Sequence, residues 1–147
     1  MQPTVAPLNA TLGAKITNID LGNMDDAAWK VVEDAFHEHA ALVFSGQNLD
    51  ADTQVDFAKR FGNLETLNPD GKPTAVAITN KKDDGSVLKS DDFRYKTLRG
   101  NEGWHTDSSY MPLAAKASIL YAQVVPPEGG ETEVADMRAA YKELSQD

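Results

Sequence analysis

Cysteine is absent from this chain of 147 residues, which excludes disulfides, thiolate metal sites and a cysteine nucleophile. No apolar run approaches the ~18 residues that a membrane-spanning helix needs. Residues 1–7 lack the basic and apolar regions of a secretory signal. Basic side chains are few, 14 against 23 acidic ones, so the formal net charge is −9. This balance argues against nucleic-acid and membrane partners, which favour clustered Lys and Arg. We expect a cytoplasmic protein.

The chain does contain enough apolar side chain to build a core. Apolar residues make up 41% of it and charged residues 25%, a composition typical of a folded chain rather than a disordered one. At roughly 100–200 residues per domain, we expect residues 1–147 to form a single domain.

Two helices are predicted in the first part of the chain. Either Asp25 or Asp26 can cap the first, because a carboxylate there accepts hydrogen bonds from N–H groups of the first turn. The inward face that the helical spacing predicts comprises Ala28, Val32, Ala35, Phe36 and His39. The second helix is predicted from its cap Asp50 to Phe61, with Gly62 in the C′ position.

Apolar runs and apolar–polar alternation predict the strands. The expected extended segments are 12–19, 41–44, 75–79, 86–88, 117–125 and 131–135, of which 117–125 is the strongest. Turns are predicted at 20–23, 80–85 and 126–130, where Gly, Pro, Asn and Asp gather. The polar segment 89–103 is predicted to be a long loop, and a helix is expected over 137–144.

His105 and Asp107 are the residues most suggestive of chemistry. In an extended strand, residues i and i+2 project from the same face, so the imidazole and the carboxylate would lie side by side. Such a pair supplies two of the three ligands of a 2-His-1-carboxylate facial triad for Fe(II). The alternative is a surface histidine paired with a neighbouring carboxylate, and that is the commoner fate of an isolated His-x-Asp triplet.

Several segments, all in register, resemble the TauD/TfdA family of 2-oxoglutarate-dependent dioxygenases. Residues 104–110 resemble its metal-binding motif, and residues 124–133 resemble its proline, diglycine and threonine segment. Residues 136–141 look like its next helix start, and residues 42–47 and 57–64 are similar to its N-terminal strand and helix end. The resemblance implies a mainly β fold with flanking helices, a double-stranded β-helix (a cupin-like jelly roll) that is incomplete in this chain.

The resemblance also implies a role for individual residues. His105 and Asp107 match the first two iron ligands of the family. Thr132 matches the threonine whose hydroxyl bonds a carboxylate of 2-oxoglutarate, although many threonines in such a place are only β-branched strand residues. Asn101 lies where some members place a polar contact to substrate, and a simple loop asparagine is an equal alternative. Trp104 would line the metal site or fill the core.

The second histidine of the triad is missing, because His105 is the last histidine of the chain. The family resemblance implies that histidine, and an arginine for 2-oxoglutarate, well beyond the last residue given. His37 and His39 diverge by about 200° around their helix and cannot share a metal ion. We therefore interpret the chain as the N-terminal half of a larger enzyme.

Charged residues of the middle segment have two interpretations. Asp83, Asp84, Asp91 and Asp92 are expected to be solvated turn charges. The basic residues Lys81, Lys82, Lys89, Arg94, Lys96 and Arg99 could attract an anionic substrate or simply keep the chain soluble.

The leading hypothesis is a non-haem, Fe(II)- and 2-oxoglutarate-dependent dioxygenase, with O2 as co-substrate and succinate and CO2 as co-products. It would hydroxylate a small organic anion: an aryloxyalkanoate, a sulfonate or a sulfate ester. Residues 107–110 and 136–138 are closer to the aryloxyalkanoate branch, and residues 65–69 lack the histidine of taurine-specific members. A non-catalytic fragment acting as an assembly module is the alternative, and a cupin-like Zn or Mn enzyme is a third hypothesis. An exposed sheet face would favour a homo-oligomer.

Overall fold

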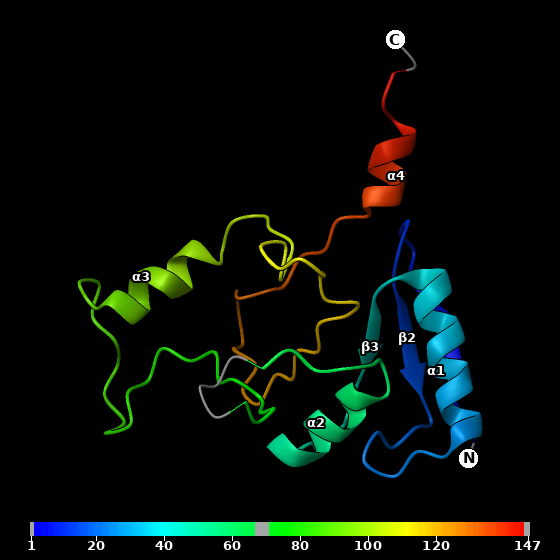
Figure 1. The fold of residues 1–147 in the computed structure, drawn as a ribbon, viewed down its shortest axis with the longest axis horizontal. Coiled ribbons are helices and arrows are strands. Elements are labelled where there is room, and N and C mark those ends of the chain that lie inside the picture. Colours follow the sequence, from blue (N-terminus) through cyan, green and yellow to red (C-terminus); the bar gives the residue numbers. More distant parts are fainter. Residues whose placement is uncertain (1, 67–70, 146–147) are drawn as a thin grey trace. The chain divides into compact units, whose positions relative to one another are not determined.

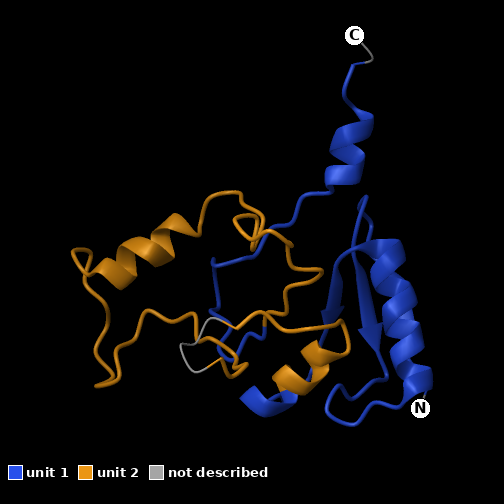
Figure 2. Cartoon of the chain, viewed as in Figure 1, with its two compact units in different colours: residues 1–53, 121–147 blue, residues 54–120 orange. Residues whose placement is uncertain are grey.

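The structure is a computed structural model that describes residues 2–66 and 71–145. The chain divides into two compact units, residues 1–53 with 121–147 and residues 54–120 (Figure 2). The expectation of a single domain stays a prediction.

The first unit is built on a three-stranded sheet, β1 (Thr4–Pro7), β2 (Ala14–Thr17) and β3 (Leu42–Phe44), in that spatial order. β1 pairs antiparallel with β2, and β2 pairs parallel with β3. The central strand alternates strictly, with Ala14 and Ile16 buried and the two residues between and after them exposed. This confirms extended structure within residues 12–19 and 41–44.

Helix α1 (Asp26–His39) connects β2 to β3 and packs against both strands (Figure 1). Its cap is Asp25, whose Oδ1 accepts a hydrogen bond from the Ala28 N–H at 2.7 Å. Val32 and Ala35 of the predicted inward face are buried, and the core lies between them and Ile16 of β2. The first predicted helix and its Asp25 cap are therefore confirmed. The other residues of the predicted inward face, Ala28, Phe36 and His39, are half-buried.

Helix α2 (Ala51–Lys59) begins where the sequence predicts. The Asp50 carboxylate accepts hydrogen bonds from the N–H and the hydroxyl of Thr53, at 2.8 and 2.7 Å. The helix ends two residues before the predicted Phe61, because the N–H groups of residues 60–62 bond to carbonyls three residues back in a tighter turn. Gly62 follows with φ 138°, a conformation that favours glycine.

The middle of the chain departs from the prediction. Residues 75–79 form no strand, and the strand expected at 86–88 is reduced to a single antiparallel bridge between Lys81 and Val87. The loop predicted over 89–103 contains helix α3 (Phe93–Gly100) instead. Its polar residues include Arg and Lys, which are strong helix formers, and Asp92 stands in the N-cap position. The polar composition of residues 89–103 therefore led to a wrong prediction of a loop at α3.

The last third lacks the strongest predicted strand. Residues 117–125 and 131–135 pair with no other strand among the residues described, and the carbonyl of Ile119 accepts instead from the Gln54 side chain at 3.1 Å. A strand needs a paired neighbour, which apolar composition alone does not provide. The turn at 126–130 is present, with Gly129 and Gly130 at φ 73° and 77°.

Helix α4 (Met137–Lys142) lies within the predicted range 137–144. Its first turn is capped by Asp136, which accepts from the N–H groups of Arg138 and Ala139. In the described residues, helices contain more of the chain than strands do, so a mainly β composition is wrong for this part. A small mixed sheet with helices is what is observed, and the jelly roll stays a prediction.

Within the described ranges, 2–66 and 71–145, no helix is both long enough and apolar enough to cross a bilayer.

The packing of β2 against α1 yields a stability prediction. Ile16 is fully buried, so Ile16→Ala should lower the free energy of unfolding by about 2–5 kcal/mol, because it removes apolar contact and leaves a cavity. Lys15→Ala on the exposed face of the same strand is the control and should change it by less than about 0.5 kcal/mol. Urea unfolding, monitored by circular dichroism, compares the two variants. Equal losses of unfolding free energy would contradict the assignment of the core.

Candidate active site

His105 and Asp107 lie side by side in the second unit, after α3. His105 Nε2 is 3.2 Å from Asp107 Oδ1. The backbone around them forms no strand: residues 104–106 are irregular and residues 107–110 form a turn. The strand on which their pairing was predicted is therefore wrong, although the two side chains do meet. Their role as metal ligands stays a prediction.

Each side chain of the pair forms a hydrogen bond to another residue through the atom that faces away from its partner. His105 Nδ1 donates a hydrogen bond to the carbonyl oxygen of Gly103 at 2.8 Å. Asp107 Oδ2 accepts from the hydroxyl of Ser118 at 2.7 Å. These contacts leave His105 Nε2 and Asp107 Oδ1 facing each other, so the orientation of both groups is set before anything binds between them.

The electrostatics of the pair favour a positive charge between the two atoms. Because a carbonyl only accepts, the Nδ1 of His105 carries the proton, and in the neutral ring Nε2 presents a lone pair to a carboxylate oxygen. The Gly103 carbonyl, and to a smaller extent the Asp107 carboxylate, raise the pKa of His105 above its ordinary value of 6.5. A proton or a metal ion on Nε2 relieves the repulsion between the lone pairs.

The pair is open to solvent. The side chains of His105 and Asp107 are 52% and 57% exposed. Trp104 is 71% exposed, so the expectation that it fills the core is wrong, and the alternative that it lines the metal site stays a prediction. An ion could reach the pair without displacing a packed side chain.

The donor atoms fit a metal ion in part. Two ligands on adjacent corners of an octahedron, each about 2.1 Å from the metal, lie about 3 Å apart. The 3.2 Å between Nε2 and Oδ1 matches that spacing, and imidazole with carboxylate is the donor set of an Fe(II) facial triad. Among the described residues, however, no group of three or more His, Asp or Glu side chains could hold a metal ion. The pair offers two ligands.

The other predicted site residues have simpler surroundings. Asn101 is the C-cap of α3, where its backbone N–H bonds to carbonyls of the last turn. Thr132 belongs to the first unit and is exposed in a segment without regular structure. Their roles toward substrate and 2-oxoglutarate stay predictions. His37 is exposed and His39 is half-buried, as the helical spacing predicts.

The basic residues of the middle segment are partly neutralised. Lys82 Nζ lies 3.1 Å from the Asp92 carboxylate, and Arg99 forms an ion pair with Glu102. Asp92 is therefore a paired charge rather than a merely solvated one, and this pairing weakens the case that these side chains capture an anion.

Sequence reasoning missed two residues that bond to residues 107–110: Ser118, which donates to Asp107, and Glu65. Glu65 accepts hydrogen bonds from the hydroxyl groups of Ser108 and Tyr110. It stands 43 residues before Ser108, and no local pattern links the two positions.

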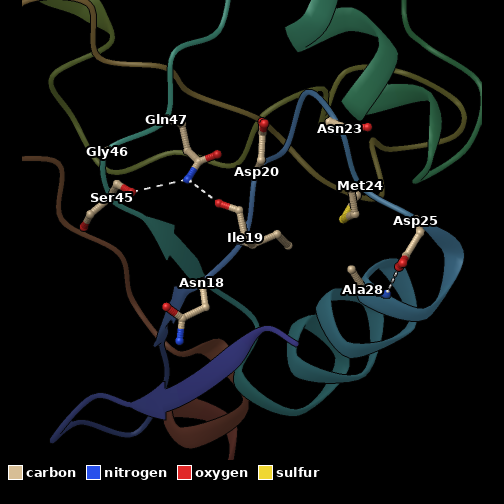
Figure 3. A pocket seen from close by; sticks show the side chains of 10 residues that line it. All are labelled: Asn18, Ile19, Asp20, Asn23, Met24, Asp25, Ala28, Ser45, Gly46 and Gln47. Atoms are coloured by element: carbon tan, nitrogen blue, oxygen red, sulfur yellow. Dashed lines mark hydrogen bonds between the residues drawn. The ribbon is translucent and has the colours of Figure 1, made fainter. Parts of the chain in front are cut away.

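An open pocket lies in the first unit between the end of β2, the start of α1 and the residues after β3 (Figure 3). Its charged lining residues are Asp20 and Asp25, and no Lys or Arg lines it. Both carboxylates accept hydrogen bonds from backbone N–H groups of their own turns, and the Gln47 amide bonds Ile19 and Ser45. This polar, acidic pocket contains none of the predicted site residues and does not suit an organic anion.

Comparison with known proteins places the chain in a family. The family model described as "Taurine catabolism dioxygenase TauD, TfdA family" matches residues 4–147. An (S)-phenoxypropionate/alpha-ketoglutarate-dioxygenase of Sphingobium herbicidovorans is 47% identical over 97% of this chain and 48% of its own length. An alpha-ketoglutarate-dependent 2,4-dichlorophenoxyacetate dioxygenase of a Burkholderia strain is 39% identical over 90% of this chain and 48% of its own.

This chain is also similar to a solved structure. The crystal structure of AAD-2 in complex with Mn(II) and N-oxalylglycine has a TM-score of 0.88 and 36% identity, over 99% of this chain and 51% of AAD-2. The chain thus spans about half the length of the relatives it matches. Because the family model covers almost every residue, the chain belongs to the TauD/TfdA family of dioxygenases.

Proposed function

We propose that this chain carries part of the active site of an Fe(II)- and 2-oxoglutarate-dependent dioxygenase. The reaction is the hydroxylation of a small organic anion, with O2 as co-substrate and with succinate and CO2 as co-products. The observation that supports it most is the 3.2 Å approach of His105 Nε2 to Asp107 Oδ1, within a chain that matches the family over residues 4–147.

In this proposal His105 Nε2 and Asp107 Oδ1 hold the metal. When bound, the metal supplies a site at which 2-oxoglutarate and O2 meet. Gly103 keeps the His105 ring in the tautomer whose Nε2 is free to bind, and Ser118 fixes the second oxygen of Asp107. The hydroxyl of Thr132 is assigned to a carboxylate of 2-oxoglutarate, and the amide of Asn101 to the substrate. The third ligand and the arginine that pairs with 2-oxoglutarate are expected outside these 147 residues.

An aryloxyalkanoate is the substrate class we favour. The names of the relatives mention phenoxypropionate and 2,4-dichlorophenoxyacetate, and a more distant relative from Pseudomonas putida is named as a sulfate ester dioxygenase. Its identity to this chain is 34%, against 47% for the phenoxypropionate enzyme. A sulfate ester is therefore the second candidate for the substrate class. The cytoplasmic location and a homo-oligomeric state remain part of this proposal.

The non-catalytic alternative is less well supported. The relatives from Sphingobium herbicidovorans, Burkholderia and Pseudomonas putida are named as dioxygenases. In this chain His105 and Asp107 are oriented toward each other. A cupin-like Zn or Mn hydrolase does not account for the match to a dioxygenase family.

Metal binding is the first test. We expect Mn(II) to bind the wild-type chain, and the loss of the EPR signal of free Mn(II) measures this binding. Either His105→Ala or Asp107→Ala should weaken the affinity by more than about tenfold. His37→Ala is the matched control, because it removes an exposed histidine from α1 and should leave the affinity unchanged. If wild type and His105→Ala titrate alike, the proposed metal site is wrong.

The pH dependence follows from the raised pKa of His105. Because the folded chain binds this proton more tightly than the unfolded chain, protonation stabilises the fold below pH 6.5, and this stabilisation is lost as pH rises through the raised pKa. Metal needs the unprotonated Nε2, so Mn(II) affinity should increase over that same interval. An NMR titration of the metal-free ring should give a midpoint above 6.5, and Asp107→Ala should lower it. A midpoint at or below 6.5 would refute this electrostatic account.

A further inference from the structure

Ser108, the residue directly after Asp107, has two unusual features. Its φ is 53°, in the left-handed region that residues other than glycine rarely adopt. Its side chain is also buried, and it is the one polar residue of the buried class in the described part of the chain. A strained backbone next to a predicted metal ligand persists only where surrounding contacts hold it in place.

The contact that holds Ser108 comes from a distant part of the same unit. The Ser108 hydroxyl donates a hydrogen bond to Glu65 Oε2. The Tyr110 hydroxyl approaches the other oxygen, Glu65 Oε1, at 3.4 Å. A single carboxylate thus receives two hydroxyl groups from residues 107–110, and hydrogen bonds to an ionised acceptor are stronger than neutral ones.

Few other contacts hold residues 104–110 in place around Ser108. These residues belong to no sheet, and the backbone bond within their turn is from the Met111 N–H to the Ser108 carbonyl at 3.0 Å. Ser118 fixes one oxygen of Asp107, and Ser108 is the next residue along the chain, so its backbone is joined directly to that of Asp107. The hydrogen bond with Glu65 reaches Ser108 from outside the turn.

We propose that Glu65 is a positioning residue for the metal site: it anchors Ser108 and so fixes the direction of the Asp107 carboxylate toward His105. This inference rests on the proposed function, because the site that Glu65 positions is the proposed metal site. Glu65 bonds Ser108 and Tyr110, and among the described residues it forms no metal-binding group with His105 and Asp107, so in this proposal it acts through Ser108.

The metal test uses variants of Glu65 and Mn(II) as the probe. Glu65→Ala should weaken Mn(II) binding about tenfold, the scale usual for groups that orient a metal ligand. Glu65→Gln should recover most of the affinity, because its amide oxygen still accepts from Ser108. Asp83→Ala, which removes an exposed carboxylate from the hairpin turn of the same unit, should bind like wild type. All three variants should keep the far-ultraviolet circular dichroism spectrum of wild type, which separates positioning from a loss of folding.

A double-mutant cycle tests the route through Ser108. Ser108→Ala should weaken binding to a similar extent, and Glu65→Ala with Ser108→Ala should be no weaker than either single variant, because both remove the same contact. Losses that add in the double variant would overturn the proposed route.

A measurement without metal separates this inference from the proposed function. Exchange of the Met111 amide hydrogen reports the order of the turn, and it should be faster in Glu65→Ala than in wild type or Asp83→Ala. Unchanged exchange overturns the role of Glu65, whether or not metal binds. Faster exchange in Glu65→Ala together with no Mn(II) binding by wild type would reject the proposed metal site while supporting Glu65 as the anchor of this turn.

Discussion

The chemistry proposed for this chain depends on one local constraint, the hydrogen bond from His105 Nδ1 to the Gly103 carbonyl. That bond decides which ring nitrogen carries the proton, so the nitrogen facing Asp107 presents a lone pair. Two acceptor atoms 3.2 Å apart repel each other unless a positive charge lies between them. A proton or a metal ion on Nε2 would each relieve this repulsion. The raised pKa of His105 itself comes first from the bond to the Gly103 carbonyl and to a smaller extent from the Asp107 carboxylate.

The sequence predicted best those features that depend on neighbouring residues. Asp25 and Asp50 cap their helices through hydrogen bonds three residues ahead, and the stripe of α1 buries Val32 and Ala35 as its spacing indicates. The strands expected at 75–79 and 117–125 are not formed, because a strand depends on distant residues: an apolar run becomes a strand only when another segment pairs with it. Helix α3 was missed because polar composition was given more weight than helix propensity.

The candidate site shows the same division between local and distant determinants. The approach of His105 to Asp107 was predicted from a strand geometry that the structure does not have, and it arises instead from separate contacts with Gly103 and Ser118. Spacing alone thus predicted the pair for the wrong reason. Glu65 could not be predicted at all, because its link to Ser108 spans 43 residues and is made by folding rather than by a motif.

Two further features have a common explanation. The pair offers two candidate ligand atoms where a facial triad needs three, and the apolar segment that includes Leu120, Val124 and Val125 is exposed and, among the described residues, unpaired. The relatives are about twice as long as this chain, so both the third ligand and the pairing strands are expected from sequence outside these 147 residues. The two candidate ligands are already oriented within this chain, because Gly103 and Ser118, which bond them, belong to it.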